Sequence, residues 1–360
     1  MTYDLESLKL PPTARWNQNG NTVAGAANGA HGSALNRLAD NFGIYFADDI
    51  LYIADEGNNR IVLIARNSTT AVRVIGRDSQ SDMFTFNYPN DVFVTRTSIY
   101  VMDTWNFRVQ KWSKDLNDAV TVAGVSGVNG SSNNMATLSD AYNLFVDNHG
   151  NLFVGDYGND RVMMFPWNSI SGTDGTIVAG TGIRGSDARQ LNGPGGIFVT
   201  DDGILYIADT DNHRIQKWII GQSLGVTVAG TGISGSDLSQ LDSPYTVLVD
   251  LNGYMYITDY GNDRIMRWAP NARAGECIVS CFRNSGISSN QLNEPSSITF
   301  DSDGSLYVND FGNNRVQKFE LLNETSMPSI CSLFFIFFPY QSVEVLPHYK
   351  VLEFKRYCLQ

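Results

Sequence analysis

The residues best suited to chemistry form one pattern, in which an aspartate is followed by asparagine three positions later and by arginine five positions later. A carboxylate beside a guanidinium could act as a catalytic acid with a clamp for an anionic substrate. The pattern occurs six times, with its aspartate and arginine at Asp55 and Arg60, Asp103 and Arg108, Asp156 and Arg161, Asp209 and Arg214, Asp259 and Arg264, and Asp310 and Arg315. A catalytic group is needed only once. We therefore interpret the pair as a structural device that fastens a tight turn, and we predict no catalytic residue.

Histidine is too scarce to build a zinc site. The four histidines are His31, His149, His213 and His348, whereas catalytic zinc usually takes three protein ligands, commonly histidines. Up-and-down strand connectivity places His149 on the face opposite His31 and His213. We therefore predict no metal site and no cofactor. Acidic loops around a central channel leave a Ca²⁺ ion there as an open alternative.

The chain is acidic, and this limits its partners. Its 360 residues hold 25 Lys and Arg against 37 Asp and Glu, a formal net charge of −12. A phosphate backbone would meet a repulsive field, so nucleic acid is not the expected partner. We expect a monomer.

Segments that direct a chain to a membrane are not expected. The first residues show no basic run before an apolar stretch, and the longest apolar run, Cys331 to Tyr340, is shorter than the roughly 20 residues that span a bilayer. We therefore expect neither a signal peptide nor a transmembrane segment. Triplets that begin at Asn67, Asn129 and Asn323 fit the N-glycosylation pattern and weakly favour an extracellular location for a chain whose N-terminus is incomplete. The compartment stays open.

A fourteen-residue phrase that carries the polar pattern recurs along the chain. One copy reads LYIADTDNHRIQKW from Leu205, and the next reads MYITDYGNDRIMRW from Met255. The aspartates of the six copies stand 48, 53, 53, 50 and 51 residues apart. Each copy is β-rich at both ends around a segment of Gly, Asn and Asp, which predicts a strand, a tight turn and a second strand.

Two further strands accompany each phrase, one before it, as in Ile197–Val199, and one after it, as in Thr227–Gly230. Four strands in about 50 residues are typical of a β-propeller blade. A strand like those that follow the phrases, Thr22–Gly25, stands before the first complete repeat. The last repeat ends at Phe319 and has no such strand after it. We therefore predict an all-β, six-bladed β-propeller with four-stranded antiparallel blades, closed by the N-terminal strand.

The repeats also set the domain limits. We assign residues 14–320 to the propeller and residues 1–13 to an N-terminal extension. Residues 321–360 fit no repeat, and we interpret them either as a disordered extension or as an artefact of the gene model.

The repeats resemble the NHL repeat. The resemblance rests on Asn212-His213-Arg214, which is close to the Asn-His-Leu tripeptide that names the family, and on Thr227–Gly232, Leu241, Pro244, Gly253, Tyr256, Asp259, Asn262 and Arg264. Two repeats depart from this pattern, because Asn41 and Ala141 stand where the other repeats have a proline before the first strand, such as Pro244. The resemblance implies a six-bladed propeller. It does not fix the function, because the family includes RNA-binding proteins, ubiquitin-ligase-associated proteins, extracellular sensors and a zinc-dependent amidating lyase. The missing histidines argue against the lyase activity.

One face of the predicted propeller offers a candidate binding surface. The turns inside the phrases and the loops from fourth to first strands emerge on the same side. The turns carry Trp105, Phe107, Tyr157, His213, Tyr260 and Phe311. Exposed aromatic side chains bring large contact area at low entropy cost, which favours ligand binding. The alternative is that several of them pack between blades.

The sequence thus predicts a non-enzymatic binding scaffold that recognises a protein, peptide or glycan through this face. A metal-assisted hydrolase or lyase with a site in the central channel is the first alternative. An RNA-binding NHL domain is the second, and the net charge of −12 argues against it.

Cys277 and Cys281 leave two redox states open. In a straight strand their separation would be about 13 Å, beyond the roughly 7 Å that a disulfide spans. A bond would need the chain to turn near Ser280, where the other repeats have glycine. Free thiols and a local disulfide are both compatible with the sequence.

Overall fold

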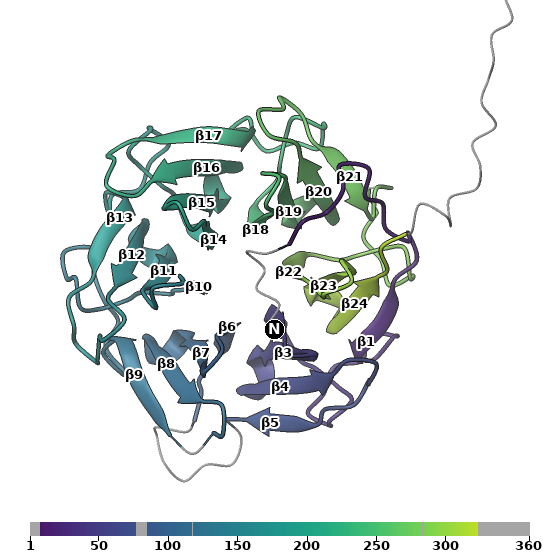
Figure 1. Cartoon of the computed structure of the whole chain (residues 1–360), viewed down its shortest axis with the longest axis horizontal. Coiled ribbons are helices and arrows are strands. Elements are labelled where there is room, and N and C mark those ends of the chain that lie inside the picture. Colours follow the sequence, from purple (N-terminus) through teal and green to yellow (C-terminus); the bar gives the residue numbers. More distant parts are fainter. Residues whose placement is uncertain (1–7, 77–84, 117, 283, 323–360) are drawn as a thin grey trace, which may run out of the picture. The chain divides into compact units, whose positions relative to one another are not determined.

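A computed structural model describes residues 8–76, 85–116, 118–282 and 284–322. Within these residues the chain up to Leu321 forms six four-stranded antiparallel sheets around a common axis (Figure 1). No helix among the described residues has both the length and the apolar character needed to cross a membrane.

The blades follow one another along the chain. Blade 1 holds β2 (Asn41–Ala47), β3 (Ile50–Asp55), β4 (Arg60–Ala65) and β5 (Arg73–Ile75), and blade 2 holds β6 (Pro89–Val94), β7 (Ser98–Asp103), β8 (Arg108–Ser113) and β9 (Ala119–Gly124). Blade 3 holds β10 (Asn143–Val146), β11 (Leu152–Asp156), β12 (Arg161–Phe165) and β13 (Thr176–Gly180). Blade 4 holds β14 (Pro194–Val199), β15 (Ile204–Asp209), β16 (Arg214–Ile219) and β17 (Gly225–Gly230). Blade 5 holds β18 (Pro244–Val249), β19 (Met255–Asp259), β20 (Arg264–Trp268) and β21 (Glu276–Val279).

Blade 6 is built from both ends of the propeller. It holds β22 (Pro295–Phe300), β23 (Leu306–Asp310) and β24 (Arg315–Phe319), and its fourth strand is β1 (Asn21–Gly25). β1 pairs antiparallel with β24, from Asn21 opposite Lys318 to Gly25 opposite Arg315. This pairing removes an open sheet edge. The predicted six-bladed propeller, closed by the N-terminal strand, is confirmed.

The second and third strands of every blade are joined by a short 3₁₀ helix. These helices are η2 (Glu56–Asn58), η3 (Thr104–Asn106), η4 (Tyr157–Asn159), η5 (Thr210–Asn212), η6 (Tyr260–Asn262) and η7 (Phe311–Asn313). Each ends at a residue in the left-handed conformation, such as Asp160 with φ +51°. Asn, Asp and His tolerate this conformation better than most residues, which explains why polar residues dominate the turns.

Burial is deepest in the inner strands. Every residue of β6 and β7 is buried, because each sheet packs against a neighbour on both faces. The outer strand β17, by contrast, exposes Val226. The inner strands therefore lack the clean apolar and polar alternation of a half-exposed sheet.

Strand direction gives the propeller two distinct faces. We call the face that carries the starts of the inner strands, the η helices and the loops between blades the turn face. We call the opposite face, which carries the hairpins between first and second strands, the hairpin face.

Residues 8–16 lie against the hairpins of blades 5 and 6. Leu8 and Leu10 are buried. The Leu251 N–H donates to the Leu8 carbonyl at 3.0 Å, and Trp16 Nε1 donates to the Gly304 carbonyl at 2.9 Å. The described part of the N-terminal extension is therefore packed on the propeller.

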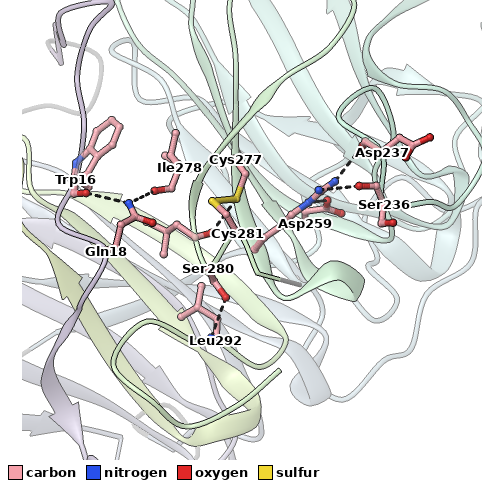
Figure 2. The surroundings of a disulfide bond; sticks show 12 residues. Trp16, Gln18, Ser236, Asp237, Asp259, Cys277, Ile278, Ser280, Cys281 and Leu292 are labelled. Carbon is pink, nitrogen blue, oxygen red and sulfur yellow. Dashed lines mark hydrogen bonds and ion pairs between the residues drawn. A yellow bond between two sulfur atoms is a disulfide. The ribbon is translucent and has the colours of Figure 1, made fainter. Parts of the chain in front are cut away.

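Cys277 and Cys281 form a disulfide, with their Cα atoms 5.6 Å apart (Figure 2). β21 ends at Val279, and Ser280 has φ +57°. The equivalent positions in the other blades are glycines with positive φ, namely Gly25, Gly76, Gly124, Gly180 and Gly230. The chain thus turns at Ser280, which brings the two sulfurs within bonding reach.

Candidate binding face

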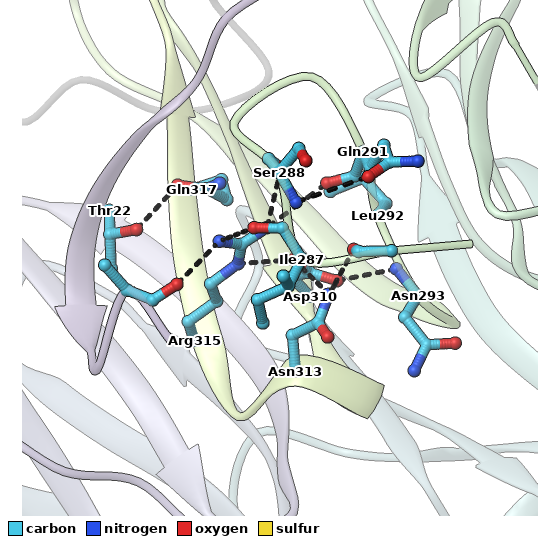
Figure 3. A network of polar contacts seen from close by, with 12 residues as sticks. Thr22, Ile287, Ser288, Gln291, Leu292, Asn293, Asp310, Asn313, Arg315 and Gln317 are labelled. Atoms are coloured by element: carbon cyan, nitrogen blue, oxygen red, sulfur yellow. Dashed lines mark hydrogen bonds and ion pairs between the residues drawn. The ribbon is translucent and has the colours of Figure 1, made fainter. Parts of the chain in front are cut away.

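Each Asp-x-x-Asn-x-Arg motif joins an η helix to the loop that enters its blade. In blade 6 the Asp310 carboxylate accepts hydrogen bonds from Arg315 Nε at 2.6 Å, Asn313 Nδ2 at 3.0 Å and the Asn293 N–H at 2.7 Å (Figure 3). The other Arg315 N–H groups donate to carbonyls of the entering loop, including Ile287 at 2.8 Å, and to the Ala27 carbonyl of the loop after β1 at 3.1 Å. The pair therefore holds the turn and the loop together.

The motif residues are withdrawn from solvent in every blade. All six aspartates and all six arginines are buried. Burial raises the pKa of Asp310, and the Arg315 charge and the hydrogen bonds to the carboxylate oppose that rise. Because these groups are covered, their contribution to a binding face is to position the turns that carry more exposed side chains.

A second contact repeats between neighbouring blades. The residue after each η helix and the residue before the next repeat's proline position both have positive φ. At five blade junctions the side chain of the residue after the η helix accepts a hydrogen bond, at 2.8 to 3.0 Å, from the backbone N–H of the residue in the next blade. The acceptor and donor residues of these pairs are Asn314 and Asp40, Asn59 and Tyr88, Asp160 and Gly193, His213 and Ser243, and Asp263 and Glu294. At the junction of blades 2 and 3 the first residue is Phe107, which has no acceptor atom.

The predicted face residues fall into different environments. Trp105 is 52% exposed and stacks on Tyr88 with ring centroids 4.1 Å apart. Phe107 and His213 occupy the positive-φ positions after η3 and η5. His213 uses Nδ1 to accept the Ser243 N–H at 3.0 Å, so this ring takes part in the contact between blades 4 and 5.

Tyr157, Tyr260 and Phe311 come together through three residues that the sequence reasoning missed. Phe42, Tyr142 and Tyr245 form a triangle, with ring centroids 4.7 Å apart for Phe42 and Tyr245, 6.3 Å for Phe42 and Tyr142, and 6.2 Å for Tyr142 and Tyr245. Tyr157 lies 5.0 Å from Tyr142, Tyr260 lies 6.0 Å from Tyr245, and Phe311 lies 5.4 Å from Phe42. We call these six rings the central aromatic cluster.

The three rings of the triangle lie at, or one residue before, the starts of alternate inner strands. Phe42, Tyr142 and Tyr245 each follow the repeat's proline position in blades 1, 3 and 5, and the other blades have Asn90, Gly195 and Ser296 there. Small residues alternate with rings, so three rings meet across the axis. This alternation is visible in the sequence and could have indicated the cluster.

Carboxylates surround the central aromatic cluster. The Tyr157 hydroxyl donates to Asp211 at 3.2 Å. Burial raises the pKa of Tyr142, and the charges of Asp140 and Glu56 raise it further. Burial and the charge of Glu294 do the same to Tyr260.

Glu56 shows how crowded these charges are. Burial first, and the nearby Asp40 second, raise the pKa of Glu56 to about 7, while a hydrogen bond from Asn90 Nδ2 at 2.9 Å opposes the rise. A cation that approaches this site would relieve the repulsion between the carboxylates. The face is thus aromatic at its centre and negatively charged around it.

The channel between the inner strands is narrow. A cavity of about 40 Å³ is lined by residues from all six inner strands, among them Ile44, Val92, Leu144, Ile197 and Ile298. This volume holds about one to three water molecules. Among the described residues, no group of three or more His, Cys, Asp or Glu side chains is placed to hold a metal ion.

Sequence comparison identifies the repeat. The NHL repeat family model matches residues 191–218 and 292–319, which are the first three strands of blades 4 and 6. The chain is a six-bladed β-propeller that contains NHL repeats. Human NHL repeat-containing protein 2 is 29% identical over 135 residues, which are 36% of this chain and 16% of that protein. Mouse NHL repeat-containing protein 3 is 24% identical over 188 residues, which are 48% of this chain and 52% of that protein. The chain thus matches about half, or less, of the length of these relatives.

Solved structures share the propeller fold. A protein of unknown function from Bacteroides thetaiotaomicron superimposes with a TM-score of 0.64 at 15% identity, covering 84% of this chain and 76% of that one. Virginiamycin B lyase from Staphylococcus aureus superimposes with a TM-score of 0.51 at 13% identity, covering 86% of this chain and 100% of the lyase. At such identities the similarity shows the fold alone. An NHL propeller is a scaffold that fits a binding role.

Proposed function

We propose that this NHL propeller is a non-enzymatic scaffold that binds a positively charged segment of a protein or peptide on its turn face. The observation that carries the proposal is the central aromatic cluster with carboxylates around it. The rings are half-buried and packed against one another, so they offer contact area without a large loss of side-chain entropy.

Charge selects the class of ligand. Lys and Arg side chains pair with carboxylates and also interact with the faces of aromatic rings. Glu56, Asp140 and Glu294 stand beside tyrosines of the cluster, so both kinds of contact are available in one place. The same charges oppose an RNA backbone, which argues against the RNA-binding alternative.

The central-channel hydrolase or lyase receives less support from the geometry. A cavity of about 40 Å³ is too small for the substrates of such enzymes. A glycan ligand would use the aromatic rings but would leave the carboxylate charge uncompensated, so a basic peptide is the better match.

The test measures binding of the full chain to three immobilised twelve-residue peptides that differ only in charge, one rich in Lys and Arg, one neutral and one rich in Glu. We expect the basic peptide to bind best. Tyr245→Leu should weaken that binding about tenfold, because it removes one of the three rings of the triangle at the centre of the cluster. Trp167→Ala is the matched control, since it removes an aromatic side chain from the opposite face, and it should change the affinity less than about twofold.

Equal binding of the three peptides would overturn the proposal, as would a Tyr245→Leu variant that folds normally and binds like the wild type. Preference for a glycan in a parallel array, lost in Tyr245→Leu, would keep the face as the site and replace the ligand class.

A further inference from the structure

The hairpin face has a crevice between blades 2 and 3 that the proposed function does not use. Its volume is about 560 Å³, and its walls include Tyr100 and Lys111 of blade 2 and Val146 of blade 3, with Asp48 of the blade 1 hairpin at one end. Trp167 stands at its rim with 67% of its surface exposed. Its size is in the range of sites that hold small molecules or peptide side chains.

The crevice between blades 5 and 6 shows what such a site can hold. There Tyr256 and Arg267 are cross-strand partners, and Phe300 is the last residue of the next inner strand. The Trp16 ring lies among them, 6.0 Å from the Tyr256 ring and 6.1 Å from the Phe300 ring, with the Arg267 guanidinium 5.7 Å from its centroid. Arg267 also donates to the Pro12 carbonyl at 3.1 Å. A peptide segment of the chain itself therefore occupies this crevice through an aromatic anchor.

The crevice between blades 2 and 3 has the same three positions. Tyr100 and Lys111 are cross-strand partners in blade 2, as Tyr256 and Arg267 are in blade 5. Val146 ends its inner strand, at the place where blade 6 has Phe300. Valine is smaller than phenylalanine, so this crevice has more room for a ring between its walls.

The charge available in this crevice is positive. The Lys111 ammonium lies over the Tyr100 ring, 5.4 Å from its centroid. Lys318 has the same relation to Tyr307 in blade 6, but it also pairs with Asp301 at 3.1 Å. Within the described part of the chain, neither Lys111 nor Arg96, the other cation of this crevice, has a carboxylate within ion-pair distance.

The acids of the crevice are already engaged. Asp147 accepts the N–H groups of His149 at 3.0 Å and Asn151 at 2.8 Å within its own hairpin. Asp48 pairs with Lys114. Counting Lys114, the site holds three cations and two carboxylates, and Lys111 and Arg96 remain available to pair with a negatively charged ligand.

We propose that this crevice binds an acidic segment of a partner protein through an aromatic anchor. The anchor's ring contacts the Tyr100 ring and the Lys111 ammonium, as the Trp16 ring meets the Tyr256 ring edge-on next to the Arg267 guanidinium. Carboxylates next to the anchor pair with Lys111 and Arg96, and Trp167 covers the segment at the rim. The site is on the face opposite the central aromatic cluster, so it stands independently of the function proposed above.

The experiment measures the fluorescence anisotropy of a fluorescein-labelled peptide, Gly-Glu-Trp-Glu-Gly-amide, titrated with the full chain. Two control peptides replace either both Glu with Gln or the Trp with Ala. We expect saturable binding of the first peptide and at least about fivefold weaker binding of each control. Lys111→Met, which keeps the apolar stem, should weaken binding about fivefold or more. Lys217→Met is the matched control, because Lys217 lies over Tyr206 in the same manner but in another blade.

Several results would overturn the proposal: no saturable binding of the Glu-Trp-Glu peptide, equal binding of the Ala peptide, or equal weakening by Lys111→Met and Lys217→Met. If Lys111→Met fails to fold, Trp167→Ala replaces it, since this side chain is largely exposed, and wild-type affinity in that variant would count against the site. Complete competition by millimolar free glutamate would show a site for small anions and would reject the peptide ligand.

Discussion

The Thr22 hydroxyl donates a hydrogen bond to the Gln317 side-chain oxygen at 3.0 Å, although 295 positions separate the two residues. This bond joins β1 to β24 and therefore closes the ring. Gly25, the last residue of β1, has φ +75°, and a Cβ atom on it would lie 2.3 Å from the Asn314 carbonyl oxygen. Closure thus depends on a backbone approach that only glycine permits.

We expect Gly25→Ala to destabilise the propeller more than the left-handed conformation alone explains. Gly127 is the matched control, because it also has φ +75° but nothing lies within 4 Å of its would-be Cβ. Gly127→Ala should lower the free energy of unfolding by about 1–2 kcal/mol. Gly25→Ala should lower it by at least about 2 kcal/mol more, because β1 must shift away from β24. Urea denaturation of both variants measures the difference, and equal losses would contradict a tight closure.

The architecture could be predicted from the sequence because every repeat indicates the same local structure. The Asp-x-x-Asn-x-Arg turns mark the strand pairs, and the early strand at Thr22–Gly25 supplies the one that the last blade lacks. The turn motifs and the total number of predicted strands both fit a closed six-bladed ring, and this agreement leaves few alternative folds.

The central aromatic cluster was harder to predict because it depends on how the ring of blades brings distant residues together. Phe42 and Tyr245 are about 200 positions apart in the sequence, and their rings come to 4.7 Å only where the inner strands converge on the axis. His213 could be identified as an aromatic turn residue, but its bond to Ser243 depends on two positive φ angles. The disulfide likewise depends on a positive φ at Ser280, a conformation that the glycines of the other repeats suggest at this position but that serine rarely adopts.

The buried motif pairs should be far more important for stability than exposed ion pairs. Arg161 and Asp156 are 2.8 Å apart, and both side chains are fully buried. Arg161→Met leaves the Asp156 carboxylate buried without its partner, so the free energy of unfolding should fall by about 3–5 kcal/mol. Arg184→Met is the control, because Arg184 pairs with Asp160 at 3.6 Å while 64% of its side chain is exposed, and it should cost less than about 1 kcal/mol. Chemical denaturation separates the two, and a loss below about 1 kcal/mol in Arg161→Met would be inconsistent with a fastening role.

Asp91 should make the propeller less stable as the pH rises toward neutrality. Its carboxylate is buried beside the channel and accepts the Leu144 N–H at 3.0 Å. Burial raises the pKa of Asp91 to about 7, although backbone hydrogen bonds oppose the rise. The folded state therefore holds this proton more tightly than the unfolded state. Stability is greatest below the unfolded pKa and decreases as the pH rises through about 7, by about 1.4 kcal/mol for each unit of pKa difference.

Asp91→Asn tests this, because the amide keeps an acceptor for the Leu144 N–H and carries no charge. The variant should exceed the wild type in stability by a few kcal/mol at pH 8, and the advantage should shrink as the pH is lowered toward 4. Asp187→Asn, at an exposed position, should show no such trend. Urea midpoints at several pH values measure the effect. An advantage that does not change with pH would show that Asp91 is ionised equally in both states.

The junction of blades 2 and 3 should be improvable by one substitution. Phe107 has φ +54° and offers no acceptor to the next blade, whereas Asn59, at the same position of blade 1, accepts the Tyr88 N–H at 2.8 Å. Phe107→Asn supplies an acceptor and a residue that tolerates this conformation, so the free energy of unfolding should rise by about 1 kcal/mol. Asn59→Ala removes the equivalent bond and should lower it by about 1–2 kcal/mol. Thermal and urea unfolding of both variants decide the matter. If both substitutions lower the free energy of unfolding, the packing of the Phe107 ring contributes more to stability than the missing hydrogen bond would.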